Sequence, residues 1–385
     1  MKDQFPVPVA RVGIIGGGQL GRMLVAAAKR LGCTCVVLDP LPRCPAGQLA
    51  GRQIVATYDD ADKVRELVEA CDVTTFELEA IDTAVLKELA NSGHRIRPTP
   101  DLLAIIQDKL TQKELLRDAN IATAEFVGVD QISPEVFAEF GYPLVQKARR
   151  GGYDGRGVAI LHAASDFDKH LPVPSYIERF VPAEKELAVL VARGDDGVSC
   201  CYPVVEMDFR EGENVLDILL APAEIDPSVA EAAQVLATRT IEAMQGVGVF
   251  GVELFLTADG ELSVNEVAPR THNSGHHTIE ACITDQFEQH LRAVIGLPLG
   301  STEQLSPAAM LNLLGDPDSQ GHPVVSGLAA ALSIPGVCVH LYGKDKTTPY
   351  RKMGHVTVLD RDIHAARDKA EQVRELITIT GEEAS

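Results

Sequence analysis

The sequence predicts an α/β domain followed by α+β units, and three patterns in it carry this prediction. Short apolar strands alternate with amphipathic helices between residues 11 and 91, which is typical of a doubly wound parallel sheet. A loop rich in glycine and arginine joins two strands at residues 149–157. Two apolar runs that meet at an Asp-Gly turn, residues 249–267, predict an antiparallel hairpin.

The composition excludes several classes of protein. With 385 residues, 45% of them hydrophobic, the chain is long enough for two or three domains. A formal net charge of −20 argues against a nucleic-acid partner or an anionic membrane surface. No apolar run is long enough to span a membrane, and residues 1–10 are not typical of a secretory signal. The eight cysteines form no CxxC pair, so we expect reduced cysteines in a cytoplasmic protein rather than a disulfide framework or a metal site.

The first strand and helix enclose a GxGxxG pattern. A strand at 11–15 leads into Gly16-Gly17-Gly18-Gln19-Leu20-Gly21, then a helix runs to Leu31, and the next strand ends in Asp39. On its face this pattern predicts a dinucleotide site for NAD. The physical basis of this pattern is less specific than NAD binding, because a glycine turn and a helix N-terminus attract any phosphate.

The other strands of this domain are expected at 53–56 and 73–76, with helices at 61–70 and 83–91. The strand at 73–76 ends in Glu77-Leu78-Glu79, at the edge where parallel sheets bind ligands. Glu77 and Glu79 could instead be acids before the helix that starts at Thr83. After Arg97-Pro98, Thr99 and Pro100 are expected to begin a helix whose pattern continues through Lys109 to Ala119.

A small α+β unit follows, with a strand near Phe126, a helix at 134–140 and a strand at 143–148 that carries Lys147. The next nine residues, 149–157, hold four glycines and three arginines before a strand at 158–161. Backbone N-H groups and guanidinium groups can surround phosphate oxygens, so we predict a phosphate lid rather than a plain hairpin loop. Further strands are expected at 175–179 and 186–192. Glu178 and Glu186 at their ends could each be a solvated charge.

The late hairpin is the feature around which we expect the chain to be organised. If Asp259 and Gly260 are the two turn residues, Glu253 faces Glu266 across the ribbon, with Cβ atoms about 4.5 to 5.5 Å apart. Like charges so placed are destabilising, unless a cation such as Mg²⁺ lies between them together with substrate phosphates. Two solvated glutamates on an outer face are the alternative. Arg270 follows the second strand and could face an oxyanion near the metal.

The remainder predicts helices at 225–245 and 279–295, a strand at 308–314, a basic cluster of Lys344, Lys346, Arg351 and Lys352, and a terminal helix at 362–377. We expect four units: a doubly wound, substrate-binding domain at 1–98, a lid subdomain at 99–192, a large subdomain with the metal hairpin at 193–300, and a C-terminal substrate-phosphate domain at 301–385.

In this order the features resemble the ATP-grasp ligases, and within them the N5-carboxyaminoimidazole ribonucleotide synthase family of purine biosynthesis. The resemblance covers nearly the whole chain. It is carried by GIIGGGQLGRM at 13–23, TFELEAI at 75–81, GGYDGRG at 151–157, NEVAPRTHNSGHHTIEAC at 265–282 and RKMGHVTVL at 351–359. One departure is Thr271, where the family more often has proline. The resemblance implies an ATP-grasp fold with an N-terminal pre-ATP-grasp domain and a small C-terminal domain.

The implied reaction is the carboxylation of 5-aminoimidazole ribonucleotide with ATP, Mg²⁺ and bicarbonate, through carboxyphosphate, releasing ADP and phosphate. ATP would be bound by Lys109, Lys147, Gly152, Tyr153, Asp154, Gly155, Arg156, Gly157, Glu178, Val181, Glu186, Asn265 and Glu266, and the metal by Glu253 and Glu266. Within this set Glu178 and Val181 resemble the adenine hinge, and Glu186 the acid that binds the ribose. The ribonucleotide would be bound by Gln19, Leu20, Glu79, Asn273, Lys344, Arg351 and Lys352.

The resemblance also implies catalytic roles for Arg270 and, on the lid, for Tyr153, Asp154 and Arg156. His276 and His272 are candidates for proton transfer, with a packing role as the alternative. The partners implied are small molecules and a second copy of the chain in a homodimer.

Four other functions compete with this one. A formate-dependent glycinamide ribonucleotide transformylase would share the lid, the metal acids and the basic cluster. Biotin carboxylase is a weaker alternative, because the chain is short for it. An NAD-dependent oxidoreductase would use the GxGxxG turn but leaves the paired glutamates unexplained. A catalytically inactive ATP-binding module would not need Lys147, Glu253, Glu266 and Arg270 together.

Overall fold

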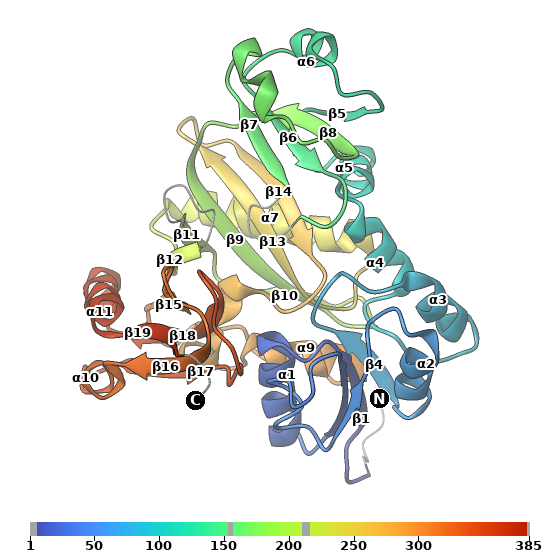
Figure 1. Ribbon diagram of the computed structural model, residues 1–385, viewed down its shortest axis with the longest axis vertical. Coiled ribbons are helices and arrows are strands. Elements are labelled where there is room, and N and C mark those ends of the chain that lie inside the picture. Colours follow the sequence, from blue (N-terminus) through green and yellow to red (C-terminus); the bar gives the residue numbers. More distant parts are fainter. Residues whose placement is uncertain (1–5, 153–156, 210–215, 383–385) are drawn as a thin grey trace.

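Four sheets organise the computed structural model, which describes residues 6–152, 157–209 and 216–382. The N-terminal sheet is parallel, with strand order β3-β2-β1-β4, and confirms the predicted doubly wound domain (Figure 1). Its elements are β1 Arg11–Ile15, α1 Gln19–Arg30, β2 Thr34–Asp39, β3 Arg52–Val55, α2 Ala61–Glu69, β4 Val73–Phe76 and α3 Thr83–Asn91. Within the described part of the chain, no helix is both long and apolar enough to cross a membrane.

The second sheet forms the lid unit at the top of Figure 1. Its antiparallel order is β5-β8-β6-β7, built from β5 Phe126–Val129, β6 Leu144–Ala148, β7 Val158–Leu161 and β8 Ser175–Arg179. One face is closed by α6 Pro134–Phe140 and the 3-10 turn Ala164–Lys169, around the buried side chains of Phe137 and Ile177. The other face carries Lys147 and looks toward the large sheet, because side chains alternate along a strand.

The third sheet is nine-stranded and runs through both remaining units, in the order β14-β13-β9-β11-β12-β15-β18-β17, with β10 beside β9. Its strands are β9 Ala183–Arg193, β10 Ser199–Cys201, β11 Val205–Phe209, β12 Leu216–Ala221, β13 Gly248–Thr257, β14 Leu262–Ala268, β15 Ala308–Leu314, β17 Val337–Leu341 and β18 Lys352–Leu359. The predicted boundary at residue 192 is therefore misplaced, since β9 pairs with β11 and β13 rather than with the lid strands. Strands β11 and β12 were not predicted.

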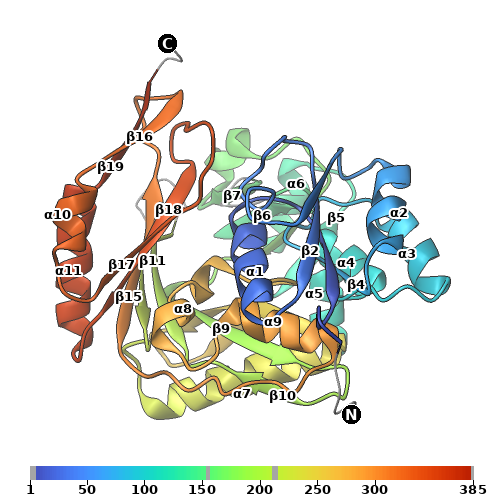
Figure 2. The same ribbon diagram turned by 90° about the horizontal axis from the view of Figure 1, so that it is seen from below.

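Helices pack on this sheet near each of its two edges. Helix α7 Pro227–Met244 packs under β9, β13 and β14 around a core that includes Phe250 and Ile241. Figure 2 shows α10 Leu328–Leu332 and α11 Ile363–Leu376 on the outer side of β15, β17 and β18, where Val373 and Ala366 are buried. The fourth sheet pairs β16 His322–Ser326 with β19 Thr378–Glu382.

Two predicted helices are each split by an aspartate. The helix expected from 100 to 119 is α4 Pro100–Gln107 and α5 Lys109–Asp118, because Asp108 is extended and its carboxylate accepts the N-H groups of Leu110 and Thr111. The helix expected at 279–295 is α8 Thr278–Ala281 and α9 Gln286–Ile295, with Asp285 as the cap of α9. An aspartate favours such a cap over a helix interior. The first break makes Lys109 the first residue of α5.

The β13–β14 hairpin reaches the predicted pairing by a different route. Near the tip, Thr257 donates its backbone N-H to the carbonyl of Glu261, and its own carbonyl accepts the N-H of Gly260. The loop between Thr257 and Glu261 has three residues, of which Gly260 alone has a positive φ, 81°. The predicted two-residue turn is therefore wrong by one position. A β-bulge between Glu253 and Leu254 shifts the register back, so that Glu253 does lie opposite Glu266.

Four buried histidines make the stability of the fold depend on pH. His276, His277, His290 and His355 are each at most 1% exposed. Burial lowers the pKa of His277 and of His290 from 6.5 to about 4, and lowers the pKa values of the other two well below 6.5. The unfolded chain therefore takes up protons below pH 6.5 while the folded chain does not.

We expect the free energy of unfolding to fall as the pH drops from 6.5 to about 4, by about 1.4 kcal/mol per pH unit for each histidine in the middle of this range. Urea unfolding over this range measures the slope. The variant His277→Gln should have a shallower slope than the wild type, whereas the exposed His364 supplies the control His364→Gln. Equal slopes for His277→Gln and the wild type would contradict this account.

Candidate active site

The centre of the site is the bulge in the β13–β14 hairpin. A bulge sets two residues of one strand against one residue of the other, and here Asn265 and Glu266 both contact groups around Glu253. The Asn265 amide nitrogen lies 3.4 Å from Glu253 Oε2, and Lys109 Nζ forms an ion pair with Glu266. The side chains of Glu253 and Glu266 are 20% and 38% exposed, so both carboxylates reach the open face of the sheet.

The two glutamates have opposite electrostatic environments. Burial, reinforced by the negative charges of Glu266 and Glu186, raises the pKa of Glu253. Burial acts the same way on Glu266, but the adjacent Lys109 outweighs it and lowers the pKa of Glu266. The charged form of one of these two carboxylates is disfavoured, and a divalent cation between them would offset their mutual repulsion.

The donor set fits Mg²⁺ bound jointly with a substrate. Among residues 6–152, 157–209 and 216–382, no group of three or more histidine, cysteine, aspartate or glutamate side chains could hold a metal on its own. Two facing carboxylates remain. Mg²⁺ is commonly held by one or two carboxylates together with phosphate oxygens and waters, so Glu253 and Glu266 match that pattern and an all-protein metal site is not needed.

Lys147 stands opposite the hairpin on the lid sheet, and a buried network fixes it. Its Nζ donates to Asn265 Oδ1 at 2.7 Å and lies 2.6 Å from Glu178 Oε1. Glu178 also lies 2.9 Å from Lys113 Nζ, and Lys113 donates to Thr123 Oγ1 at 2.6 Å. These contacts link the lid sheet to the β14 strand.

The carboxylate of Glu178 is occupied by contacts within the protein, so a role in the predicted adenine hinge would fall to the backbone of Glu178. Its carboxylate is 3% exposed and lies between two lysines, which lower its pKa although burial alone would raise it. Its function here is to fix Lys147. Lys113 was not predicted to belong to the site, because nothing in the sequence distinguishes it from other lysines on helices. The fold places it beside Glu178.

The base of the lid is anchored on α5, while the tip of the lid, with Tyr153, Asp154, Gly155 and Arg156, lies outside the described residues. The guanidinium of Arg149 donates to both oxygens of Asp108, at 3.0 and 2.7 Å, and its carbonyl accepts the N-H of Lys109. At the other end the carbonyl of Gly157 accepts the N-H of Ala148. Gly152 and Gly157 thus sit where the two lid strands leave the sheet.

A cavity of about 560 Å³ lies between the hinge after β8 and the tip of the metal hairpin. Val181 and Pro182 line one side of it, and Thr257 and Ser263 line the other. This volume is within the usual range for small-molecule sites. Glu186 lies on β9, paired with Phe255 of β13, and burial raises its pKa.

The loop 270–277 follows the hairpin and carries several predicted residues. Arg270 Nε lies 2.9 Å from Glu79 Oε1, which joins the hairpin to the N-terminal domain. His272 Nε2 lies 3.4 Å from Glu253 Oε1. The side chain of His272 packs over Gly251, where an added Cβ atom would come within 2.7 Å of both Cβ and Cγ of His272. Both polar atoms of the Asn273 side-chain amide are buried without a hydrogen-bond partner among the described residues.

The structure does not support proton transfer by His276. Its ring is 1% exposed, packs 4.6 Å from the ring of His355 and near Phe287, and Nδ1 lies 3.2 Å from Gln286 Nε2. Burial, and then the charge of Lys352, lowers its pKa well below 6.5, so the ring is neutral. The structure therefore supports the packing alternative for His276, and His272 is the histidine that lies beside Glu253.

The GxGxxG turn binds two carboxylates of its own chain, which overturns the NAD prediction. Glu77 accepts the N-H groups of Gly18 and Gly21 at the N-terminus of α1, the second at 2.5 Å. Asp39 accepts the N-H of Gly17 at 2.8 Å and the hydroxyl of Tyr58 at 2.7 Å. The places that would receive a pyrophosphate and a ribose hydroxyl in a dinucleotide site are thus filled from within.

The same contacts correct the alternative for Glu77, since it caps α1 rather than α3. Helix α3 is capped by Asp82, whose side chain accepts the N-H of Ala84. Gln19 is the first residue of α1 and is half-buried, beside Glu77's contacts. The side chain of Leu20 is 7% exposed and packs into the N-terminal core, so any contact of Leu20 with a substrate must come from its backbone.

The basic cluster of the C-terminal domain lies against the N-terminal domain. Lys344 Nζ donates to the carbonyl of Lys352 at 2.6 Å, and Arg351 donates to the carbonyl of Lys346. The carbonyl of Gly343 in this cluster accepts Gln48 Nε2 at 2.7 Å, and Gln48 Oε1 accepts Arg22 Nη1 at 3.1 Å. Arg22 lies within the GGGQLGRM motif and adds a cation beside the cluster. Arg22 was not predicted to belong to the site, although its position within this motif could have indicated it.

Three family models match successive parts of the chain. Residues 9–107 match the ribonucleotide synthetase preATP-grasp domain, residues 114–287 the ATP-grasp domain, and residues 308–369 the phosphoribosylaminoimidazole carboxylase C-terminal domain. These ranges follow the N-terminal sheet, the lid with the metal hairpin, and the C-terminal strands described above.

Curated relatives agree with these matches. An N5-carboxyaminoimidazole ribonucleotide synthase from Synechococcus elongatus is 42% identical over 91% of this chain and 90% of its own length. A chloroplastic phosphoribosylaminoimidazole carboxylase from Vigna aconitifolia is 41% identical over 90% of this chain. The chain spans only 64% of the length of that second relative.

Solved structures are similar over nearly the whole chain. The N5-carboxyaminoimidazole ribonucleotide synthetase from Thermotoga maritima has a TM-score of 0.91 and 50% identity, with 97% of this chain and 100% of that chain covered. The Aspergillus clavatus synthase in complex with ADP and 5-aminoimidazole ribonucleotide has a TM-score of 0.87 and 36% identity, with 95% and 98% covered. The ATP-grasp fold expected from the sequence is confirmed.

Proposed function

Because the chain belongs to the N5-carboxyaminoimidazole ribonucleotide synthase family of ATP-grasp proteins, we propose that it carboxylates the 5-amino group of 5-aminoimidazole ribonucleotide. The reaction consumes ATP and bicarbonate and releases ADP and phosphate. The observation that carries this proposal is the pair of facing glutamates on the bulged hairpin, with Lys109 and Lys147 on either side.

Glu253 and Glu266 would hold Mg²⁺, with Asn265 beside them. When bound, Mg²⁺ would neutralise the negative charge that develops on the phosphate oxygens during transfer. Lys109 and Lys147, which contact Glu266 and Asn265, would bind the same phosphates. The cavity beside Val181 would receive the adenine, and Glu186 would accept hydrogen bonds from the ribose hydroxyls.

The chemistry proceeds in two transfers. A bicarbonate oxygen attacks the γ-phosphorus of ATP, ADP leaves, and carboxyphosphate forms. The 5-amino nitrogen then bonds to the carboxyl carbon, or to carbon dioxide released from carboxyphosphate, phosphate leaves, and the nitrogen loses a proton. Arg270, whose guanidinium is paired with Glu79 at the end of the hairpin, would hold the anionic intermediate. His272, next to Glu253, is the candidate for moving the proton.

The second substrate would lie between the N-terminal domain and the 270–277 loop. Asn273 offers an amide whose polar atoms have no partner among the described residues. Glu79 and Gln19 lie on the domain opposite, and Lys344, Arg351 and Lys352, with Arg22 beside their loop, supply positive charge for a 5′-phosphate. The lid residues Tyr153, Asp154 and Arg156 would close over the reacting groups and exclude water.

The test is ADP release with magnesium-ATP and bicarbonate in the presence of one second substrate at a time: 5-aminoimidazole ribonucleotide, glycinamide ribonucleotide with formate in place of bicarbonate, or biotin. Turnover that requires 5-aminoimidazole ribonucleotide is the expected result. Turnover only with formate and glycinamide ribonucleotide would overturn the substrate assignment and leave the ATP and metal assignments in place. Absence of ADP in every mixture would overturn the enzyme assignment itself.

Two further proposals rest on the family alone. We propose a homodimer and a cytoplasmic location. Both can be measured directly, the first by light scattering of the purified protein and the second by fractionation of the cells that express it.

A further inference from the structure

A buried glutamine at the start of α9 is bonded to the 270–277 loop by its whole side-chain amide. Gln286 is fully buried. Its Oε1 accepts the backbone N-H of His272 at 2.8 Å, and its Nε2 donates to the backbone carbonyl of His272 at 2.8 Å. The same Nε2 lies 3.2 Å from Nδ1 of His276. The amide therefore binds His272 as a neighbouring strand would, with one donor and one acceptor in register.

The two hydrogen bonds to His272 hold a short segment near Arg270 and Glu253, which both have roles in the proposed reaction. Arg270 lies two residues before His272, and the His272 ring lies 3.4 Å from Glu253. Gly275 packs directly on the amide of Gln286, where a Cβ atom would come within 2.6 Å of it. The loop, all of whose residues the structure describes, contains no strand or long helix, so the two hydrogen bonds from Gln286 contribute to holding the backbone of His272 in place beside β13.

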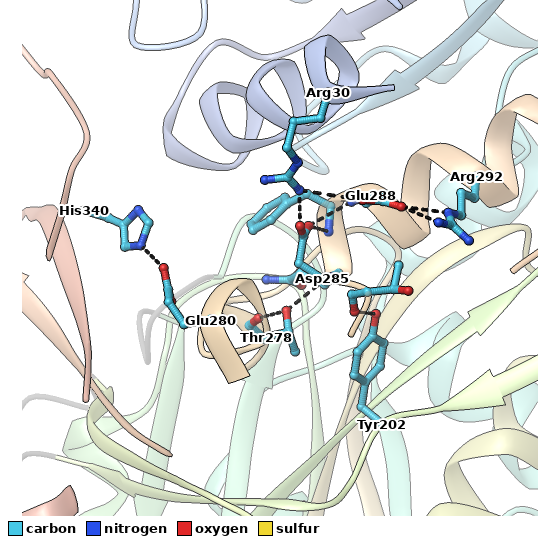
Figure 3. A network of polar contacts seen from close by, with 12 residues as sticks. Arg30, Tyr202, Thr278, Glu280, Asp285, Glu288, Arg292 and His340 are labelled. Atoms are coloured by element: carbon cyan, nitrogen blue, oxygen red, sulfur yellow. Dashed lines mark hydrogen bonds and ion pairs between the residues drawn. The ribbon is translucent and has the colours of Figure 1, made fainter. Parts of the chain in front are cut away.

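The segment around Gln286 is held by three sets of contacts. Its backbone N-H donates to Thr278 Oγ1 at 3.0 Å. Figure 3 shows Arg30 of α1 pointing at Asp285 and Glu288 in the first turn of α9, so the N-terminal domain anchors the residue before Gln286. On the other side of the loop, Glu280 of α8 bonds to His340 of the C-terminal domain at 2.6 Å, also visible in Figure 3.

We propose that Gln286 is a positioning residue for the carboxylation reaction: it holds His272, and with it the 270–277 loop, at the distance from Glu253 that the chemistry requires. This inference rests on the proposed function. The side-chain amide of Gln286 contacts the backbone of His272 and the ring of His276, so it would act on the reaction through the loop that carries these two residues.

The chain offers a matched control on the same helix. Gln289 is also fully buried, and its amide makes the same reciprocal pair of bonds with Gly300, donating to the carbonyl at 2.9 Å and accepting the N-H at 2.8 Å. Loss of either glutamine amide leaves one backbone N-H and one carbonyl without that partner, so the cost to stability should be similar. Gly300 lies outside the proposed active site.

The experiment compares Gln286→Met and Gln289→Met, since methionine keeps an unbranched side chain and removes both hydrogen bonds. We expect similar losses in melting temperature. Gln286→Met should lower kcat about 10- to 100-fold while the KM for ATP changes less than about 2-fold, whereas Gln289→Met should keep kcat within about 2-fold of the wild type. Gln286→Glu, which retains the acceptor for the His272 N-H, should lie between Gln286→Met and the wild type.

Hydrogen exchange provides a readout that does not depend on the identity of the substrate. Amides of residues 270–277 should exchange faster in Gln286→Met but not in Gln289→Met, and amides near Gly300 should show the reverse. Equal kinetic losses in the two variants, or unchanged exchange of residues 270–277 in Gln286→Met, would overturn the proposal. If Gln286→Met does not fold, Gln286→Glu is read by the same two criteria. A wild type without turnover would contradict the proposed function, and the exchange comparison would still decide the role of Gln286.

Discussion

Replacing Glu266 by glutamine is expected to lower ADP formation about a thousandfold. The substitution keeps the size of the side chain and removes a charge that the structure places opposite Glu253 and against Lys109. A bound metal contributes several kcal/mol of charge stabilisation in the transition state, and about 1.4 kcal/mol corresponds to a factor of ten in rate. The measurement is the steady-state rate of ADP release at saturating magnesium-ATP.

The control is Asp259→Asn, which makes the same carboxylate-to-amide change at the exposed tip of the same hairpin. It should retain a rate within about 2-fold of the wild type, as for other surface substitutions away from special features. If Glu266→Gln also stays within a few-fold of the wild type, Glu266 does not bind the metal and the interpretation of the hairpin is wrong.

Replacing Lys147 by methionine should have the second largest effect, because it removes a cation that both the ATP phosphates and Glu178 would require. We expect kcat/KM for ATP to fall about a hundredfold or more, in line with the loss of one preorganised group that stabilises developing charge. Of its two lysine partners among the described residues, Glu178 would keep Lys113, at a cost of about 3 kcal/mol in the free energy of unfolding. Steady-state kinetics and urea unfolding measure the two effects.

Lys185→Met is the matched control for this variant. Lys185 follows the hinge on β9, next to Glu186, and therefore points to the opposite face of the sheet, where its Nζ lies 2.7 Å from Glu206. That partly exposed pair should be worth about 1 kcal/mol or less, with no loss of kcat/KM. Equal kinetic losses in Lys147→Met and Lys185→Met would show that Lys147 acts only through stability.

The facing glutamates could be predicted from the sequence because strand pairing has a fixed period. The Asp-Gly turn set the register, and the predicted pairing of Glu253 with Glu266 is correct. It is correct through two compensating features: the loop has three residues, and the bulge restores the shifted register. The same bulge explains why Asn265 faces the site with Glu266, which strict alternation along a strand would forbid.

Other parts of the site depend on contacts between segments far apart in the chain. No local pattern indicates that Glu77 and Asp39 occupy the glycine turn, because their partners lie 59 and 22 residues away in the sequence. From the sequence, the position of Glu178 near the end of a strand is consistent with a hinge residue. Its contacts with Lys113 and Lys147 appear once the fold is known. The burial of His276 and the amide bonds of Gln286 likewise follow from the packing of α9 and β18 against the loop.

The central claim is that this site transfers a phosphoryl group from ATP to bicarbonate before the ribonucleotide is carboxylated. The most direct test starts turnover with fresh oxygen-18 bicarbonate, magnesium-ATP and 5-aminoimidazole ribonucleotide, and stops it before the bicarbonate exchanges its label with water. Mass spectrometry then measures the label in the released phosphate. The account predicts that each phosphate released carries one oxygen from bicarbonate, in step with ADP and carboxylated ribonucleotide. Phosphate whose added oxygen comes only from water would contradict it, because ATP would then be hydrolysed without passing through carboxyphosphate.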